Sequence, residues 1–230
     1  MSNNLLWIIL LLVNYIGITL SYKFFKKTGL FIWIAMAAIV ANIQVIKTIE
    51  VFSYVTTLGN IIYGTSYLAT DILNEKYGKK EAQKGVYIGI FILITVTLIM
   101  QICLMFSPLG DDPVAMANSN ALDVIFSFLP RITFASVLAY SISQLHDVWA
   151  YNIWREKMPK HLWVRNNLST LTSQLIDNII FTFVAFYGIF EINIIIEIFI
   201  TTYIMKFIVA ALDTPFIYLA KKMHSEEELQ

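Results

Sequence analysis

Residues 197–220 have the sequence EIFITTYIMKFIVAALDTPFIYLA, a largely apolar stretch that nevertheless contains Lys206 and Asp213. A transmembrane α-helix needs about 20 mainly apolar residues, because each residue lengthens the helix by about 1.5 Å. A charged side chain near the bilayer centre costs about 2.5–3.5 kcal/mol, so it is expected to face the protein interior and to find a partner there. This stretch therefore predicts a membrane-spanning helix with one polar face.

The whole chain has the composition of an integral membrane protein. Of its 230 residues, 58% are hydrophobic and 14% are charged, and the mean hydropathy is +0.68. A soluble domain of this size could not bury so much apolar surface. We therefore expect an all-α integral membrane protein with seven spans, at residues 5–22, 30–46, 58–75, 86–106, 128–152, 168–188 and 197–220. Residues 45–58 could belong to a span or to an outer loop, and a count of six spans stays open.

The distribution of basic residues predicts the orientation in the membrane. Short loops rich in Lys and Arg stay on the cytoplasmic side. Such loops follow the first, third, fifth and last predicted spans, whereas the loops at 107–120 and 188–193 contain no Lys or Arg. The N-terminus is therefore predicted outside and the C-terminus inside. Lys47 and Glu50 would then lie at the outer surface.

Several functional classes find no support in the sequence. The formal net charge is zero and no basic arm occurs, so we expect no nucleic-acid partner. The histidines lack metal-ligand spacing, and neither H-E-x-x-H nor G-x-S-x-G occurs, so we expect no metal, no cofactor and no enzymatic activity. Small-residue spacings such as Ala37-x-x-x-Ala41 would suit a homodimer but are too common in membrane helices to establish one.

Polar residues recur at helical spacing on four of the predicted spans. Residues three, four, seven and eleven apart share one face of a helix. The polar stripes contain Asn60, Tyr63, Tyr67, Thr70, Asp71 and Asn74; Ser136, Tyr140, Ser143, Gln144, Asp147 and Tyr151; Thr170, Ser173, Gln174 and Asp177; and Tyr203, Lys206 and Asp213. They predict a polar cavity within the bilayer. Asp177 and Lys206, both near mid-membrane, are candidates for an ion pair, which could also serve only to join two helices.

Motifs along most of the chain carry a resemblance to a known family. They are ANIQVIK at 41–47, YLATDILNEKYG at 67–78, RITFASVLAY at 131–140 followed by Gln144 and Asp147, WVRNN at 163–167, Ser173-Gln174 with Asp177-Asn178, and Lys206 followed by LDTP at 212–215. In this order and spacing they resemble the queuosine precursor transporter family, also called the vitamin uptake transporter family. The resemblance covers roughly residues 30–222.

The resemblance implies a carrier in the cell membrane that imports 7-deazaguanine precursors of queuosine. The substrate would be 7-cyano-7-deazaguanine, 7-aminomethyl-7-deazaguanine or queuine. The family has six core spans, so residues 29–222 would form this six-helix transporter core. Residues 1–28 would be an extra N-terminal transmembrane helix with its basic loop, and residues 223–230 a cytoplasmic tail. The core would be similar to the substrate-binding membrane subunits of energy-coupling-factor importers.

The chemistry of a deazaguanine ring suggests how the polar faces could bind it. Its N–H and exocyclic amine suit a carboxylate, its carbonyl suits an amide or ammonium group, and its faces suit aromatic rings. The candidate substrate-binding residues are Asn42, Gln44, Tyr140, Gln144, Asp147, Gln174, Asp177 and Lys206. Candidate gating or structural residues are Lys47, Thr70, Asp71, Glu75, Arg131, Asp213 and Pro215.

Two other functions fit some of the same residues. A substrate-binding subunit of a multicomponent importer would bind the same ligand but would need an ATPase partner, because this chain has no Walker motif. A retinal-binding seven-helix protein would need a buried lysine in its last helix, a demand that Lys206 meets. The preferred precursor, the coupling ion and the oligomeric state stay open.

Overall fold

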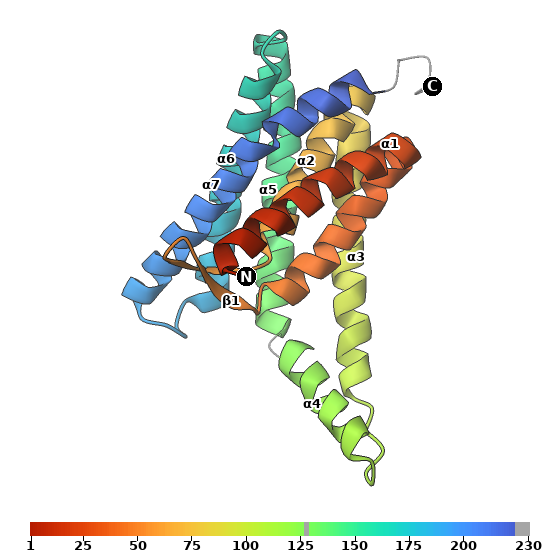
Figure 1. Cartoon of the computed structure of the whole chain (residues 1–230), viewed down its shortest axis with the longest axis vertical. Helices are drawn as coiled ribbons and strands as arrows, with labels where there is room; N and C mark the ends of the chain where they lie inside the picture. The colour runs from red at the N-terminus through yellow and green to blue at the C-terminus, as the bar shows by residue number, and fades with distance from the viewer. Residues whose placement is uncertain (127–128, 224–230) are drawn as a thin grey trace.

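The computed structural model describes residues 1–126 and 129–223, and helices dominate it (Figure 1). The helices are α1 (Asn3–Gln44), α2 (Asn60–Tyr77), α3 (Lys79–Leu104), α4 (Pro113–Phe126), α5 (Leu129–Lys157), α6 (Leu162–Phe186) and α7 (Ile192–Lys222). Two short strands, β1 (Thr48–Val51) and β2 (Tyr54–Thr57), separate α1 from α2. The predicted tail beyond residue 223 lies outside the described residues.

Helix α1 is a hairpin of two antiparallel halves. The chain reverses at Lys26, whose φ of 51° and ψ of −133° are not helical. The Ser21 hydroxyl then donates a 3.0 Å hydrogen bond to the Gly29 carbonyl across the turn. Gly17 lets the halves approach closely, since a Cβ atom there would come within 2.7 Å of the Trp33 ring. The halves correspond to the first two predicted spans.

Apolarity distinguishes the helices from one another. Among the described residues, α1, α3, α6 and α7 are each long and apolar enough to cross a membrane, and α4 with α5, bent by 45°, would make a fifth such span. Helix α2 is not apolar enough to meet this requirement, and α5 does not meet it alone. These two helices carry buried polar side chains such as Asp71 and Asp147, which lower their apolarity. The predicted outer loop at 107–120 is partly helical, because α4 begins within it at Pro113.

The segment that the sequence left open, residues 45–58, forms an antiparallel β-hairpin. Thr48 pairs with Thr57 and Val51 with Tyr54, and the turn residues Phe52 and Ser53 have positive φ. Alternating β-branched and aromatic residues in TIEVFSYVTT favour such a strand pair over a helix. The expected all-α class is confirmed, and this one hairpin is a small addition to the helices.

The first half of α1 holds the hairpin in place. The Asn3 amide donates to the Glu50 carbonyl at 3.0 Å, and the Phe52 N–H donates to Asn4 Oδ1 at 2.8 Å. The Trp7 and Phe52 rings pack edge to face with centroids 5.8 Å apart. The hairpin is thus tied to the N-terminal end of the chain.

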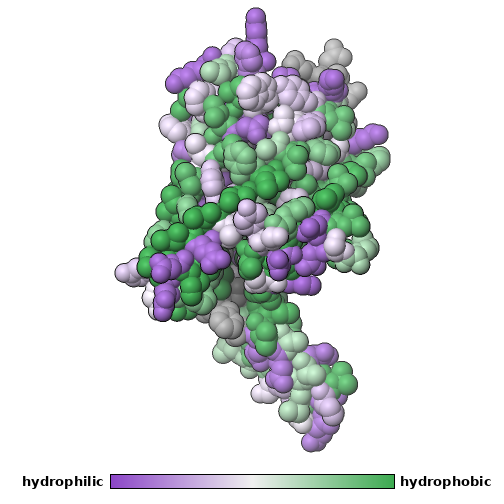
Figure 2. All heavy atoms as spheres, turned by 60° about the vertical axis from the view of Figure 1, so that its left-hand side comes forward, coloured by the Kyte–Doolittle hydropathy of each residue, from purple (hydrophilic) through white to green (hydrophobic). Residues whose placement is uncertain are grey.

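Polarity is arranged as in a membrane protein, with polar groups inside and apolar groups outside. The buried residues include Asp71, Gln144, Asp147, Arg165 and Asp213, while large apolar side chains are exposed along α1, α3 and α7. Figure 2 shows hydrophobic side chains across the middle of one face, with hydrophilic ones concentrated above and below. This distribution suits a bundle that is surrounded by lipid at its waist.

Candidate functional site

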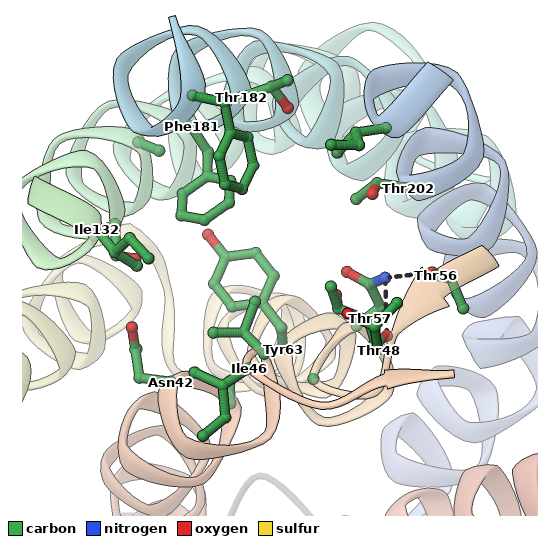
Figure 3. A pocket seen from close by; sticks show the side chains of 18 of the residues that line it. Asn42, Ile46, Thr48, Thr56, Thr57, Tyr63, Ile132, Phe181, Thr182 and Thr202 are labelled. Carbon is green, nitrogen blue, oxygen red and sulfur yellow. Dashed lines mark hydrogen bonds between the residues drawn. The ribbon is translucent and has the colours of Figure 1, made fainter. Parts of the chain in front are cut away.

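A cavity of about 670 Å³ extends from the β-hairpin into the bundle. This volume is within the range of small-molecule binding pockets. The β-hairpin, the second half of α1, the start of α2, the first half of α5, the end of α6 and the first half of α7 all line it. Segments that are far apart in the chain thus enclose one site, part of which is seen in Figure 3.

A buried ion pair lies at the inner end of this cavity. Lys206 Nζ on α7 contacts Asp177 Oδ2 on α6 at 2.5 Å, and the two side chains are only 5% and 4% exposed. The Tyr63 hydroxyl donates to Asp177 Oδ1 at 2.5 Å, and the Ser143 hydroxyl donates to the same oxygen at 3.3 Å. Lys206 Nζ also lies 5.1 Å from the centroid of the Tyr63 ring. Donors from three other helices therefore hold the Asp177 carboxylate.

The cavity walls are mainly aromatic and aliphatic, with a few polar groups. In Figure 3 the side chains of Phe181 from α6 and Tyr63 from α2 project into the cavity, while Thr48, Thr57 and Thr202 lie along another part of its wall. Tyr140 is 2% exposed and lines the cavity, and its hydroxyl has no hydrogen-bond partner among the described residues. The hydroxyl itself is buried against Gly89 of α3, where an added Cβ atom would lie 2.2 Å from it, so the ring and not the hydroxyl is available to a ligand.

The structure brings half of the predicted substrate-binding residues to this cavity. Asn42, Tyr140, Asp177 and Lys206 line it. Gln44, Gln144, Asp147 and Gln174 do not belong to its lining. The prediction rested on a shared helical face, and residues on one face can lie at different depths and against different neighbours.

Two of the glutamines outside the cavity differ in their contacts. Gln144 joins α5 to α2, since its Nε2 donates to Ser66 at 3.0 Å and its Oε1 accepts from Thr70 at 3.2 Å. Gln174 is fully buried, yet neither atom of its amide has a hydrogen-bond partner within residues 1–126 and 129–223. The side-chain Oε1 of Gln44 is likewise buried without such a partner.

Three carboxylates lie deeper in the bundle than the ion pair. Thr170 donates to Asp71 at 3.0 Å, and Asn166 donates to Asp213 at 2.7 Å. Asp147 lies close to Asp71, and neither of its oxygens has a hydrogen-bond donor at bonding distance in the part of the chain that the structure describes. All three acids are at most 1% exposed.

A second buried ion network closes the end of the bundle away from the β-hairpin. Arg165 Nη2 contacts both oxygens of Glu75, at 2.6 and 2.7 Å. Lys221 contacts the same carboxylate at 2.8 Å, and the Tyr151 hydroxyl donates to it at 3.0 Å. Four helices, α2, α5, α6 and α7, meet at Glu75.

The remaining predicted residues lie apart from the cavity lining. The exposed Arg131 donates through Nε to the Val184 carbonyl at 2.8 Å and through Nη2 to the Tyr187 carbonyl, so it binds free carbonyls at the end of α6. Lys47 is exposed beside β1. Pro215 is an exposed residue within α7.

Sequence reasoning did not include Tyr63 and Arg165 among the site residues. Tyr63 lies one helical turn after Asn60 in a polar stripe, which was an available signal for its place beside Asp177. Arg165 was expected in a cytoplasmic loop, but α6 begins at Leu162 and buries it. An arginine followed directly by a polar stripe was the available signal for its interior position.

Together, the lipid-facing helices, the enclosed cavity and the ion pair at its base define a small-molecule transporter of the membrane. The comparisons with known proteins agree. The family described as "Putative vitamin uptake transporter" matches residues 57–220, from the end of β2 to α7. The chain belongs to the queuosine precursor transporter family, and it is a multi-pass protein of the cell membrane.

Curated relatives carry the family name. A "Probable queuosine precursor transporter" of Bacillus subtilis (strain 168) is 46% identical over 230 residues, which cover 99% of each chain. The "Queuosine precursor transporter" of Escherichia coli (strain K12) is 26% identical over 147 residues, 64% of this chain and 62% of the relative. A Haemophilus influenzae relative is 27% identical over 136 residues, 59% of this chain and 54% of its own. No solved structure matches.

Proposed function

We propose that this protein imports a 7-deazaguanine precursor of queuosine through the cavity above Asp177 and Lys206. One observation carries the proposal: a buried acid and a buried base lie side by side at the inner end of a cavity of ligand size. The names of the relatives in B. subtilis and E. coli favour this class of substrate. The substrate would be 7-cyano-7-deazaguanine, 7-aminomethyl-7-deazaguanine or queuine.

The ion pair has the hydrogen-bonding groups that one edge of the ligand requires. A 7-deazaguanine ring carries an N–H and an amine that can donate to a carboxylate, next to a carbonyl that can accept from an ammonium group. Asp177 and Lys206 offer these two groups 2.5 Å apart. The ligand would insert its edge between them, replacing one interaction with several of the same polarity. Phe181, Tyr63 and Tyr140 would pack against its faces.

We also propose the seven-span topology, with the N-terminus outside. The spans would be the two halves of α1 followed by α2, α3, α5, α6 and α7. The positions of the basic residues support this orientation, since Arg155, Lys157, Lys221 and Lys222 lie in the last turns of α5 and α7. Residues 1–28 would then precede a six-helix core at 29–222, and the β-hairpin would face the outside.

In this orientation the structure corresponds to an outward-facing transporter. The cavity begins at the β-hairpin, whereas the Glu75 network joins the helices at the cytoplasmic end. Import would require the network at Glu75 to open after the substrate reaches Asp177, while the β-hairpin end closes. Such alternation of access around a central site is the usual mechanism of secondary transporters.

The experiment is uptake of radiolabelled 7-cyano-7-deazaguanine into liposomes that contain only this purified protein. We expect accumulation that unlabelled 7-aminomethyl-7-deazaguanine or queuine reduces and guanine does not. Asp177→Asn should abolish uptake, while Asp111→Asn, at an exposed loop residue, should leave it unchanged. Uptake without ATP would also exclude the need for an ATPase partner. If none of the three precursors is taken up or raises the melting temperature, the proposal is wrong.

A further inference from the structure

Three buried acids between the cavity and the Glu75 network have no basic partner in the part of the chain that the structure describes. Asp71 on α2, Asp147 on α5 and Asp213 on α7 are at most 1% exposed. Their hydrogen-bond donors are neutral, Thr170 for Asp71 and Asn166 for Asp213. Neither oxygen of Asp147 has a donor at bonding distance in residues 1–126 and 129–223. The function proposed above uses none of these acids.

The buried bases nearby are engaged elsewhere. Lys206 pairs with Asp177, and Arg165 pairs with Glu75. Among the described residues, no salt bridge joins a base to Asp71, Asp147 or Asp213. The cluster would therefore carry up to three uncompensated negative charges if all three acids were ionised.

Such a charge would be costly in this position. An ion that is moved out of water without a partner loses several kcal/mol of solvation even after the protein relaxes. Neighbouring carboxylates also repel one another, and two that lie close together commonly share one proton. Asp71 and Asp147 lie close enough to interact in this way. Binding of protons removes both costs.

The groups that face Asp147 come from several helices. Ser169, Thr170 and Ser173 lie near it on α6, and Asp213 faces it from α7. From α2 the facing groups are Asp71 and Tyr67. On α5 itself the neighbouring His146 points to Ser173, with Nδ1 at 2.9 Å from the hydroxyl. At the edges of the cluster, Tyr151 lies near Asp71 and Tyr15 near Asp213. Within the described residues of these helices, no lysine or arginine forms an ion pair with the cluster.

A proton suits this cluster better than a metal ion does. A metal ion needs several oxygen, nitrogen or sulfur ligands at short, similar distances. Within the described part of the chain, no three His, Cys, Asp or Glu side chains are grouped closely enough to hold one. A proton needs only one carboxylate oxygen and one acceptor, which Asp147 and Asp71 offer.

Hydrogen bonds lead from Asp177 to the helical turns that precede two of the acids. Ser143 donates to Asp177 at 3.3 Å, and Tyr67 donates to Ser143 at 2.8 Å. Ser143 lies one helical turn before Asp147, and Tyr67 lies one turn before Asp71. A change at Asp177 on substrate binding would therefore act on the turns of α5 and α2 that precede Asp147 and Asp71.

We propose that Asp147, together with Asp71 and Asp213, forms a proton-binding site that couples proton entry to import. The inference rests on the proposed function, because it names the ion that accompanies the substrate. The proton is bound to a carboxylate while the cavity is open to the outside. It leaves to water on the cytoplasmic side when the Glu75 network opens. Only an O–H bond is formed and broken in each step.

The first arm of the test needs no substrate. Infrared spectroscopy of the protein in lipid vesicles should show the carbonyl band of protonated carboxylic acids at neutral pH. Asp147→Asn and Asp71→Asn should each reduce the band, whereas Asp111→Asn, at an exposed acid, should not. The Asn side chains keep the shape of the acids and, like the protonated acids, carry no charge, so these variants should fold. If wild-type protein has no such band, the proton site does not exist.

The second arm measures coupling in vesicles that contain a trapped pH-sensitive dye. Added 7-cyano-7-deazaguanine should acidify the interior with wild-type protein and with Asp111→Asn. With Asp147→Asn the acidification should disappear, and an inward pH gradient should no longer accelerate uptake. Uptake that follows a Na⁺ gradient, or that moves no protons, would overturn the coupling. A carboxylic acid band without any uptake would keep the proton site and reject the proposed substrate instead.

Discussion

Arg165 on α6 binds both carboxylate oxygens of Glu75 on α2, and the two side chains are only 2% and 7% exposed. Glu75 lies 15 residues after Asn60, where α2 begins next to the β-hairpin. At about 1.5 Å per residue, this pair lies roughly 22 Å along the helix from the hairpin. The bundle is therefore tied together at the end farthest from its cavity.

Removal of the negative charge of Glu75 should lower the stability of the folded protein. Glu75→Gln leaves Arg165 buried without an anion, and breaking a buried pair in this way costs about 3–5 kcal/mol. We expect a clear fall in the melting temperature of the purified protein. The control is Glu81→Gln, which removes an ion pair to Lys27 whose side chains are 28% and 42% exposed. That change should cost less than about 1 kcal/mol. Equal effects of the two variants would contradict a structural tie at Glu75.

Variants of the Asp177–Lys206 pair should show whether it serves ligand binding or only joins two helices. Asp177→Asn leaves Lys206 buried and unpaired, so we expect both a lower melting temperature and a loss of ligand binding. The double variant Asp177→Asn with Lys206→Met removes both charges and should recover much of the stability. It should still fail to bind 7-cyano-7-deazaguanine, measured as thermal stabilisation. If the double variant binds like the wild type, the pair only joins α6 to α7.

The hydroxyl of Tyr140, buried against Gly89 without a hydrogen-bond partner among the described residues, predicts that its removal has little effect. Tyr140→Phe removes no hydrogen bond that the described residues make, so the melting temperature without ligand should not fall. The hydroxyl packs against Gly89, so affinity should fall by less than the roughly 3- to 10-fold that loss of a hydrogen bond to the ligand would cause. Tyr63→Phe, in contrast, breaks the bond to Asp177 and should lower both quantities. A loss of affinity of roughly 10-fold or more for Tyr140→Phe would contradict this and would mean that the hydroxyl turns from Gly89 to the ligand.

Arg131 should matter for folding and not for selectivity. Its guanidinium binds carbonyls of Val184 and Tyr187, and Arg131→Ala would leave them without this donor. A lost hydrogen bond to a charged group costs about 1.5–3 kcal/mol, so we expect a lower melting temperature. Uptake per folded molecule and the order of preference among competitors should stay the same. A changed preference would instead support a role in gating.

The sequence predicted the polar interior well but not the depth of its members. The ion pair expected between Asp177 and Lys206 is present, because both residues lie near the middle of long apolar helices. Gln144 and Asp147 share the polar face of α5 with Tyr140, yet only Tyr140 reaches the cavity. Helical spacing gives the direction of a side chain, whereas the neighbouring helices decide what it contacts.

Two features of the fold depended on contacts that a single sequence does not reveal. The strands at 48–57 have only four residues each, so their alternating residue pattern is a weaker signal than the apolar segments on either side. Their position depends on Asn3 and Asn4, which are more than forty residues away in the chain. The burial of Arg165 likewise depends on Glu75, ninety residues earlier.

The contact between the first residues of α1 and the β-hairpin has a practical consequence. Asn3 and Asn4 bind the backbone of Glu50 and Phe52, and the same hairpin contributes Thr48 and Thr56 to the cavity wall. An affinity tag or fluorescent protein fused ahead of Asn3 would therefore lie next to the hairpin that lines the cavity. Fusions after Lys222, at the opposite end of the bundle, are the better choice for transport assays.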